Sequence, residues 1–232
     1  MKKPSLTPEL LAREEDLIER AINKTYIDPT GKSAPQPDGI IDIDEYVKAN
    51  YRILWILKES HDGPIDSDNR GGWSIKEALR DMPWEMLKNP AYKRPSEIAF
   101  GLLNGVYSAE NIPRGYRSEA LQAAIQKIAL INVCKLPGST KTNNRDVTTA
   151  YEQHRELILQ QIAAYEPTHI FTCEPQASLL AADLSTAQWK TYNTASTLEL
   201  ENGALLICVY HPSARVARED YLNDAIEAAL KR

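Results

Sequence analysis

The 232-residue sequence has no apolar run approaching the roughly 20 residues that a membrane-spanning helix needs. Its first eight residues, Met-Lys-Lys-Pro-Ser-Leu-Thr-Pro, contain two lysines but no apolar segment of the kind found in signal peptides. We therefore expect a cytoplasmic protein with no membrane partner.

The sequence is also poor in cysteine, with only Cys134, Cys173 and Cys208. No Cys-x-x-Cys pair is present, so neither a zinc site nor an iron–sulfur cluster is indicated. All three cysteines lie in or at the end of apolar runs, which is typical of buried, reduced thiols. We expect no metal and no cofactor, and a purified protein that is colourless and free of stoichiometric iron.

Positive charge is in deficit, since 27 Lys and Arg face 32 Asp and Glu, giving a net charge of −5 and a pI of about 5.5. This balance argues against a dedicated, high-affinity nucleic-acid binder. A local basic face remains compatible with it, because phosphate contacts depend on where the charges lie. The composition, 43% hydrophobic and 25% charged, suits one soluble domain or one domain with an added N-terminal helix.

Short apolar runs alternate with segments of helical periodicity along most of the chain. The runs predict four buried strands, at residues 52–57, 128–134, 169–173 and 204–209. Helices are predicted at residues 74–82, 96–107, 118–124, 147–165, 176–184 and 219–231. Asn202-Gly203 predicts a hairpin leading into the fourth strand. This order indicates a three-layer α/β/α fold around a central, mainly parallel four-stranded sheet.

The chain divides into two expected parts. Residues 1–50 form an N-terminal helical extension packed on the domain, with a helix at 5–24, a loop at 28–39 and a short helix at 43–50. Residues 51–232 form the α/β domain.

Polar residues follow the expected strands, at the sheet edge where parallel sheets bind ligands. Lys58-Glu59-Ser60-His61-Asp62 follows the first strand and Glu174-Pro175 the third. Asn132 lies at the end of the second, and His211-Pro212-Ser213 follows the fourth. A histidine at such a place can polarise a carbonyl or stabilise an anion. The alternative is a strand-terminating turn with incidental polar residues.

These segments, in this order, resemble the uracil-DNA glycosylase superfamily, most nearly its iron–sulfur-type branch. The similarity runs from about Arg52 to the C-terminus. It covers Lys58 to Asp62, the aromatic segment Gly71-Gly72-Trp73-Ser74, the stretch Ile131 to Gly138, and His211 to Ser213. The chain departs from that family in three respects. The first motif lacks its glycines, the aromatic residue is Trp, and the four cluster-binding cysteines have no counterpart.

The resemblance implies hydrolysis of the N-glycosidic bond of uracil or a related damaged base in DNA. It makes Glu59 and His211 catalytic, with Glu59 activating water and His211 bonding the base O2 as charge develops. It makes Trp73, Asn132 and Ser213 substrate-binding. The structural alternatives are a core anchor for Trp73, a backbone-capping amide for Asn132, and a surface carboxylate paired with lysine for Glu59.

Lys135, Lys141, Arg145, Arg215 and Arg218 lie in loops expected on the same edge, where they are candidates to bind DNA phosphates. Ordinary solvated charge is the alternative for each. His61 and Asp62 are further candidates to assist Glu59. We expect a monomer that binds single- or double-stranded DNA. Two other readings stay open: a non-catalytic nucleic-acid or nucleotide-binding module, and a hydrolase of free nucleosides.

Overall fold

The computed structural model describes residues 6–60, 70–138 and 143–231. Its helices are α1 (Pro8–Thr25), α2 (Ile43–Lys48), α3 (Ile75–Asp81), α4 (Pro83–Met86), α5 (Pro90–Asn104), α6 (Glu119–Gln126), α7 (Asn144–Tyr165), α8 (Gln176–Leu184) and α9 (Arg218–Leu230), with a 3-10 turn, η1, at Ala109–Asn111. Its strands are β1 (Ser33–Ala34), β2 (Gly39–Ile40), β3 (Ile53–Leu57), β4 (Arg70–Gly71), β5 (Ala129–Asn132), β6 (His169–Thr172), β7 (Lys190–Tyr192), β8 (Ala195–Glu199) and β9 (Leu205–Cys208).

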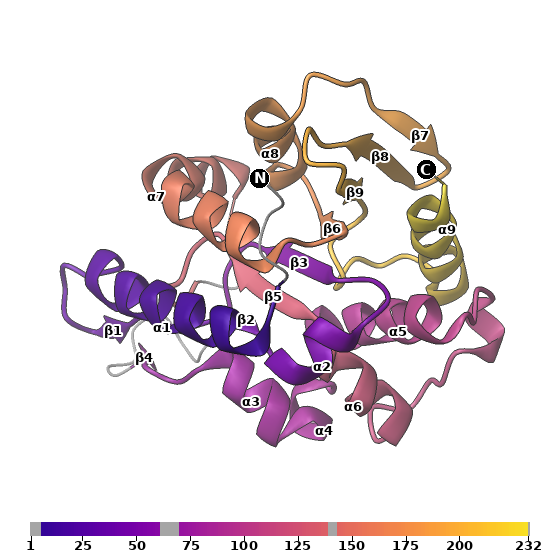
Figure 1. Cartoon of the computed structure of the whole chain (residues 1–232), viewed down its shortest axis with the longest axis horizontal. Helices are drawn as coiled ribbons and strands as arrows, with labels where there is room; N and C mark the ends of the chain where they lie inside the picture. Colours follow the sequence, from indigo (N-terminus) through magenta and orange to yellow (C-terminus); the bar gives the residue numbers. More distant parts are fainter. Residues whose placement is uncertain (1–5, 61–69, 139–142, 232) are drawn as a thin grey trace.

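The central sheet is mostly parallel, as predicted for an α/β protein (Figure 1). Its strand order is β2-β5-β3-β6-β9-β8-β7, and the four predicted strands are the adjacent parallel strands β5, β3, β6 and β9. The expected number of four strands is wrong, because β2, β8 and β7 add antiparallel strands at the two edges. Strand β8 and the turn that leads into β9 form the hairpin that Asn202-Gly203 predicted. Strands β2 and β7 were missed, because two or three residues are too few to show a periodic pattern.

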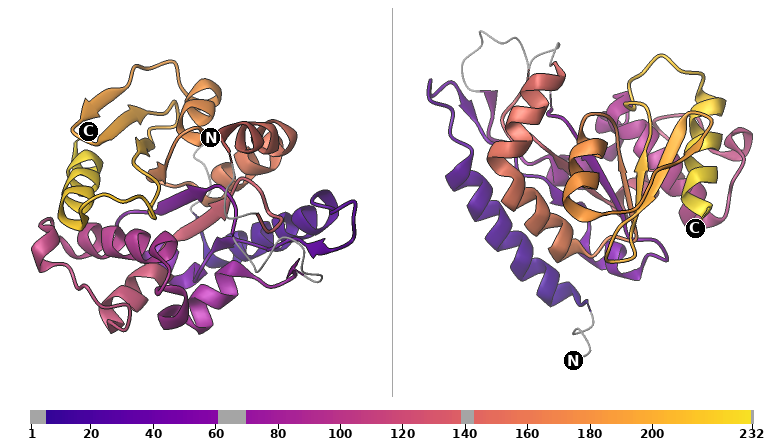
Figure 2. Two further views of the ribbon diagram at one scale, coloured as in Figure 1. Left: turned by 180° about the vertical axis from the view of Figure 1, so that it is seen from behind. Right: turned by 90° about the horizontal axis from the view of Figure 1, so that it is seen from above.

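Helices flank the sheet on both sides (Figure 2). On one side α3, α5, α6 and α9 enclose an apolar core with Trp55 and Phe171, whose rings stack with centroids 5.0 Å apart. On the other side α1, α7 and α8 enclose a second core. The central strands β3 and β5 are buried on both faces, which explains their unbroken apolar sequences.

The N-terminal segment contributes directly to the sheet. Gly39 and Ile40 pair with Leu130 and Ala129, so β2 extends the sheet beyond β5. Helix α1 begins as predicted, with Pro8 in its first turn and the Thr7 hydroxyl accepting the Leu10 N–H at 3.3 Å. It lies against α7 (Figure 2).

Helix α5 begins six residues before the position predicted from the periodicity. Asn89 caps it, accepting the Ala91 N–H at 2.9 Å, and Pro90 occupies the first turn. The predicted helix started at residue 96, whereas Pro95 lies inside the observed one. The short helix α4 was also missed, although Pro83 marks its start. Of the helices in the three described stretches, none is long and apolar enough to cross a membrane.

Candidate active site

A pocket of about 590 Å³ opens at the carboxyl ends of β3 and β5. It is lined by residues from five separate segments of the chain: Leu57, Lys58, Glu59, Ser60, Trp73, Glu85, Met86, Asn89, Ala91, Tyr92, Asn132, His211 and Ser213. All five residues that the sequence assigned to catalysis and substrate binding are among them. The structure thus brings Glu59, Trp73, Asn132, His211 and Ser213 together around one cavity.

Asn132 is the last residue of β5 and is only 2% exposed. Its backbone N–H donates to Asp38 Oδ2 at 2.7 Å. Among the residues that the structure describes, its side-chain amide has no hydrogen-bond partner. The structural alternative, an amide that satisfies neighbouring backbone groups, is therefore not what is observed. An almost buried amide beside a cavity offers one donor and one acceptor to a ligand.

Behind Asn132 lies a buried cluster of Asp38, Lys135 and Gln161. The Lys135 ammonium donates to both Asp38 oxygens at 2.8 Å and to Gln161 Oε1 at 2.8 Å, and neither Lys135 nor Asp38 exposes any side-chain surface. Burial lowers the pKa of Lys135, and Asp38 opposes that shift. The prediction that Lys135 contacts phosphate is wrong, because its charge is enclosed and paired. The cluster instead fixes the end of β5 through the Asn132 N–H.

His211 is held in the turn after β9. Its Nδ1 accepts the Ser213 N–H at 3.1 Å, and the Ala214 N–H donates to its carbonyl oxygen at 2.7 Å. A ring nitrogen that accepts a hydrogen bond carries no proton, so the neutral ring carries its proton on Nε2. Burial lowers the pKa of His211, and the positive charge of Lys58 lowers it further. The site therefore favours a neutral imidazole with one N–H to donate.

Glu59 is half-buried and packs tightly against Gly138. A Cβ added at Gly138 would lie 1.9 Å from Glu59 Cγ and 2.7 Å from its Oε1. The Gly138 N–H donates to the Ser60 carbonyl at 2.9 Å, which ties the loop after β5 to the loop after β3. The missing side chain at Gly138 therefore leaves the space that Glu59 occupies.

Trp73 lines the pocket and follows two glycines with positive φ, 73° at Gly71 and 75° at Gly72. At Gly71 a Cβ would lie 2.0 Å from the Ala34 carbonyl oxygen, so the close pairing of β1 and β4 requires glycine there. The indole is half-buried and packs on the apolar core while lining the pocket. Trp73 is thus a core anchor that also lines the pocket, and its stacking on a base stays a prediction.

Several pocket residues were missed by the sequence. Tyr92 is buried, and burial, with the charge of Asp38, raises its pKa to about 12. The sequence signal that locates it is Asn89-Pro90, a cap and first-turn proline that begin α5 and place Tyr92 near the cavity. Lys58 was considered only as a partner of Glu59 and also lines the pocket.

The remaining candidate cations divide into two kinds. The prediction that Arg218 contacts phosphate is wrong, because its guanidinium donates to Glu97 at 2.9 Å. It also donates, at 2.9–3.1 Å, to carbonyl oxygens in η1 and the loop after it, those of Ala109, Ile112 and Pro113. It fastens α9 to α5 and η1. Arg145 and Arg215 are exposed, as a phosphate contact requires. Lys141, His61 and Asp62 lie outside the described residues.

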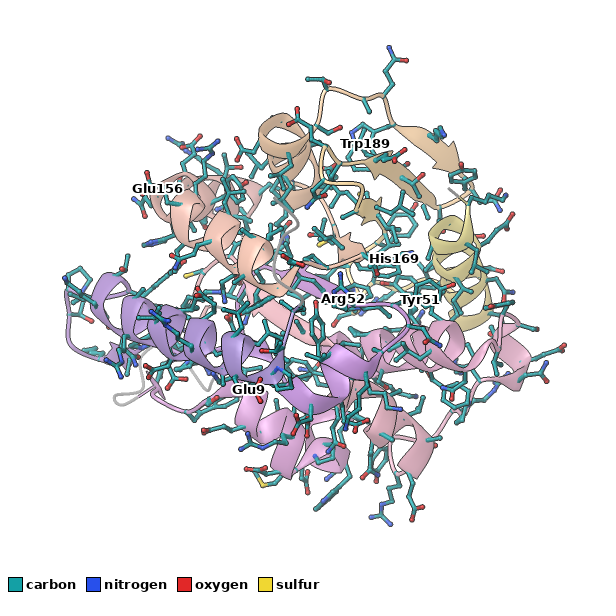
Figure 3. The ribbon with its side chains drawn as sticks, viewed as in Figure 1. Glu9, Tyr51, Arg52, Glu156, His169 and Trp189 are labelled. Carbon is teal, nitrogen blue, oxygen red and sulfur yellow. The ribbon has the colours of Figure 1, made fainter. Side chains whose placement is uncertain are left out.

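The other described histidines lie away from the pocket. His169 begins β6, at the opposite end of the parallel strands, near Tyr51 and Arg52 (Figure 3). His154 stacks on Tyr26, with ring centroids 3.8 Å apart. In the described parts of the chain no group of three or more His, Cys, Asp or Glu is arranged to hold a metal ion.

The three cysteines are free thiols. Cys173 is buried, as predicted, and burial raises its pKa to about 11. Cys134 and Cys208 are only partly buried.

No known protein-family model matches this chain, and no curated protein matches it in sequence. The assignment of function therefore depends on the pocket itself.

Proposed function

We propose that the protein is a DNA-base N-glycosylase that hydrolyses the bond between deoxyribose and uracil or a related damaged base. The proposal includes the three-layer arrangement of the uracil-DNA glycosylases, which the sequence resembles. The observation that carries it is the unpartnered side-chain amide of Asn132 at the wall of a pocket that also holds Glu59, Trp73 and His211. The proposal is for a protein that acts as a monomer.

The pocket offers what a flipped-out base requires. The indole of Trp73 provides a face for stacking. The amide of Asn132 provides a donor and an acceptor for a uracil-like Watson–Crick edge. A base that lacks this pattern leaves the amide unsatisfied, which costs about 1–3 kcal/mol per unmade bond.

In the reaction a water oxygen attacks C1′ while the bond from C1′ to the base nitrogen breaks. The electron pair of that bond leaves with the base, which departs as an anion and is then protonated by solvent. Glu59 orients the water and accepts its proton. The Nε2–H of neutral His211 donates to the base O2 as negative charge develops there. Donors of this kind typically contribute about 10²–10³ in rate.

The test is incubation with oligonucleotides that contain uracil or hypoxanthine, followed by alkaline cleavage of abasic sites. We expect cleavage by the wild type, loss of base discrimination in Asn132→Ala, and slower cleavage with nearly unchanged DNA binding in His211→Ala. Asn111→Ala, at an exposed asparagine outside the pocket, is the matched control.

Two outcomes would overturn the proposal. A wild type that cleaves neither base but binds DNA with salt-dependent affinity is a binding module. A wild type that neither cleaves nor binds DNA is neither a DNA glycosylase nor a DNA-binding module, and free nucleosides become the substrates to test.

A further inference from the structure

Four side chains beside the pocket form an alternating series of aromatic rings and cations, which we call the cation–aromatic row: Trp84, Lys88, Tyr116 and Arg117. The Lys88 ammonium lies 5.0 Å from the Trp84 ring centroid and 5.8 Å from that of Tyr116. The Arg117 guanidinium lies 5.6 Å from the Tyr116 ring on the same row. Helices α4 and α6, which carry or flank these residues, are neighbours in the fold (Figure 1).

The cation–aromatic contacts of the described residues are concentrated in this row. Such contacts are attractive because a cation over a ring face interacts with the ring quadrupole. Three pairs lie in the cation–aromatic row alone, out of the five recorded among the described residues. The row therefore holds more than half of the cation–aromatic contacts recorded among the described residues.

Three members of the row are exposed and the fourth is partly so. Trp84 is 42% exposed, the Lys88 side chain is 47% exposed, and Arg117 is exposed. Tyr116 is half-buried, with part of its surface packed on the apolar core. Met82, just before Trp84, is 52% exposed. Large apolar side chains gathered on a surface indicate a place where a partner binds.

The row begins at the rim of the pocket. Glu85, Met86 and Asn89 line the cavity, and Trp84 and Lys88 are next to them in the chain. A strand whose base enters the pocket therefore has its neighbouring nucleotides within reach of the row.

We propose that the cation–aromatic row binds single-stranded DNA next to the nucleotide held in the pocket. Bases stack on Trp84 and Tyr116, and phosphates contact Lys88 and Arg117. Surfaces that combine aromatic faces with positive charge bind single strands in this way, because every base has a face to stack. In a duplex those faces are covered by neighbouring base pairs. This inference rests on the proposed function for the position of the strand.

The carboxylate of Glu85 lies 2.6 Å from the Lys88 ammonium. This contact does not remove Lys88 from the row, because an ammonium has three N–H donors. A phosphate bonds the donors that Glu85 leaves unused.

The experiment measures binding of an unmodified, fluorescently labelled single strand of about 12 nucleotides, within the usual site size of about 4–16. Trp84→Ala should weaken binding about 5- to 100-fold, and Trp84→Phe should restore part of the loss. Lys88→Met should lower the slope of log affinity against log salt by about 0.7. Tyr107→Ala, at a tyrosine 50% exposed and outside the row, is the control and should change nothing.

The proposal is overturned if the wild type does not bind the single strand, or if Trp84→Ala binds it as well as Tyr107→Ala does. It is also overturned if Trp84→Ala weakens duplex and single strand equally. Because the oligonucleotide contains no damaged base, cleavage is not needed for this result. A protein that binds through the row but cleaves nothing supports the surface and rejects the glycosylase.

Discussion

Replacing Lys135 by methionine tests whether the buried cluster supports the site. Methionine fills similar space but leaves Asp38 buried without its cation, and Asp38 still accepts the Asn132 N–H. Removing one partner of a buried ion pair costs about 3–5 kcal/mol. For a domain of about 150–250 residues, 1 kcal/mol changes the Tm by about 2–4 °C. We therefore expect Lys135→Met to lower the Tm by about 6–20 °C.

The measurement is thermal denaturation followed by circular dichroism, with two comparison variants. Arg215→Met removes an exposed cation that the sequence grouped with Lys135, and it should change the Tm very little. The double variant Asp38→Asn with Lys135→Met removes both charges while keeping an amide oxygen for the Asn132 N–H. It should be more stable than Lys135→Met alone, because no uncompensated charge remains.

A Lys135→Met variant that melts within about 2 °C of wild type, a change worth about 1 kcal/mol or less, would contradict a supporting role for this ion pair. So would a double variant that is less stable than the single one. Either result would mean that the ion pair does not hold the end of β5 as its distances indicate.

Three other predictions concern the pocket and its rim. Gly138→Ala should slow base release on the order of 10²-fold, because the new methyl group displaces Glu59. Gly115→Ala is the control and should not slow it, because a Cβ there meets nothing within 4 Å. Equal rates in the two variants would contradict the packing of Glu59 on Gly138. Lys58→Met should raise the pKa of His211 part of the way toward 6.5, since burial is the larger cause of its lowering and Lys58 the smaller, as histidine NMR signals against pH would show. Because the unfolded chain takes up this proton at higher pH than the folded one, the His211 contribution to stability falls as pH drops below about 6.5, and less so in Lys58→Met; an unchanged His211 titration would refute the coupling. Arg215→Met should lower the slope of log affinity against log salt for duplex DNA by about 0.9. Arg218→Met should leave that slope unchanged and lower the Tm, because buried Glu97 loses its nearer cation at 2.9 Å and keeps only Lys93 at 3.9 Å. The reverse pattern would restore Arg218 as a phosphate contact.

The central part of the fold could be predicted from the sequence. Strands buried on both faces need unbroken apolar runs, so the segments ending at Leu57 and Asn132 were recognisable as parallel strands. Because parallel strands end at one sheet edge, the same reading correctly placed Glu59, Asn132 and His211 around one cavity. Their chemical roles stay predictions.

The short strands at the two edges of the sheet could not be predicted from the sequence. Strand β2 lies in a segment rich in Pro, Gly and Asp, and its pairing comes from contact with β5 rather than from its own two residues. Helix α4 has only four residues, about one helical turn, and a single turn cannot show a repeating amphipathic pattern.

Which charged residues are buried and which face solvent depends on contacts between distant parts of the chain. Lys135 and Arg215 look alike in sequence, since both are cations in polar loops after a strand. Their environments differ because Asp38 and Gln161, distant in the chain, meet Lys135 in the interior, while Arg215 remains in solvent. A charge is buried only where a partner from elsewhere in the fold compensates its lost hydration, and local sequence carries no record of that partner.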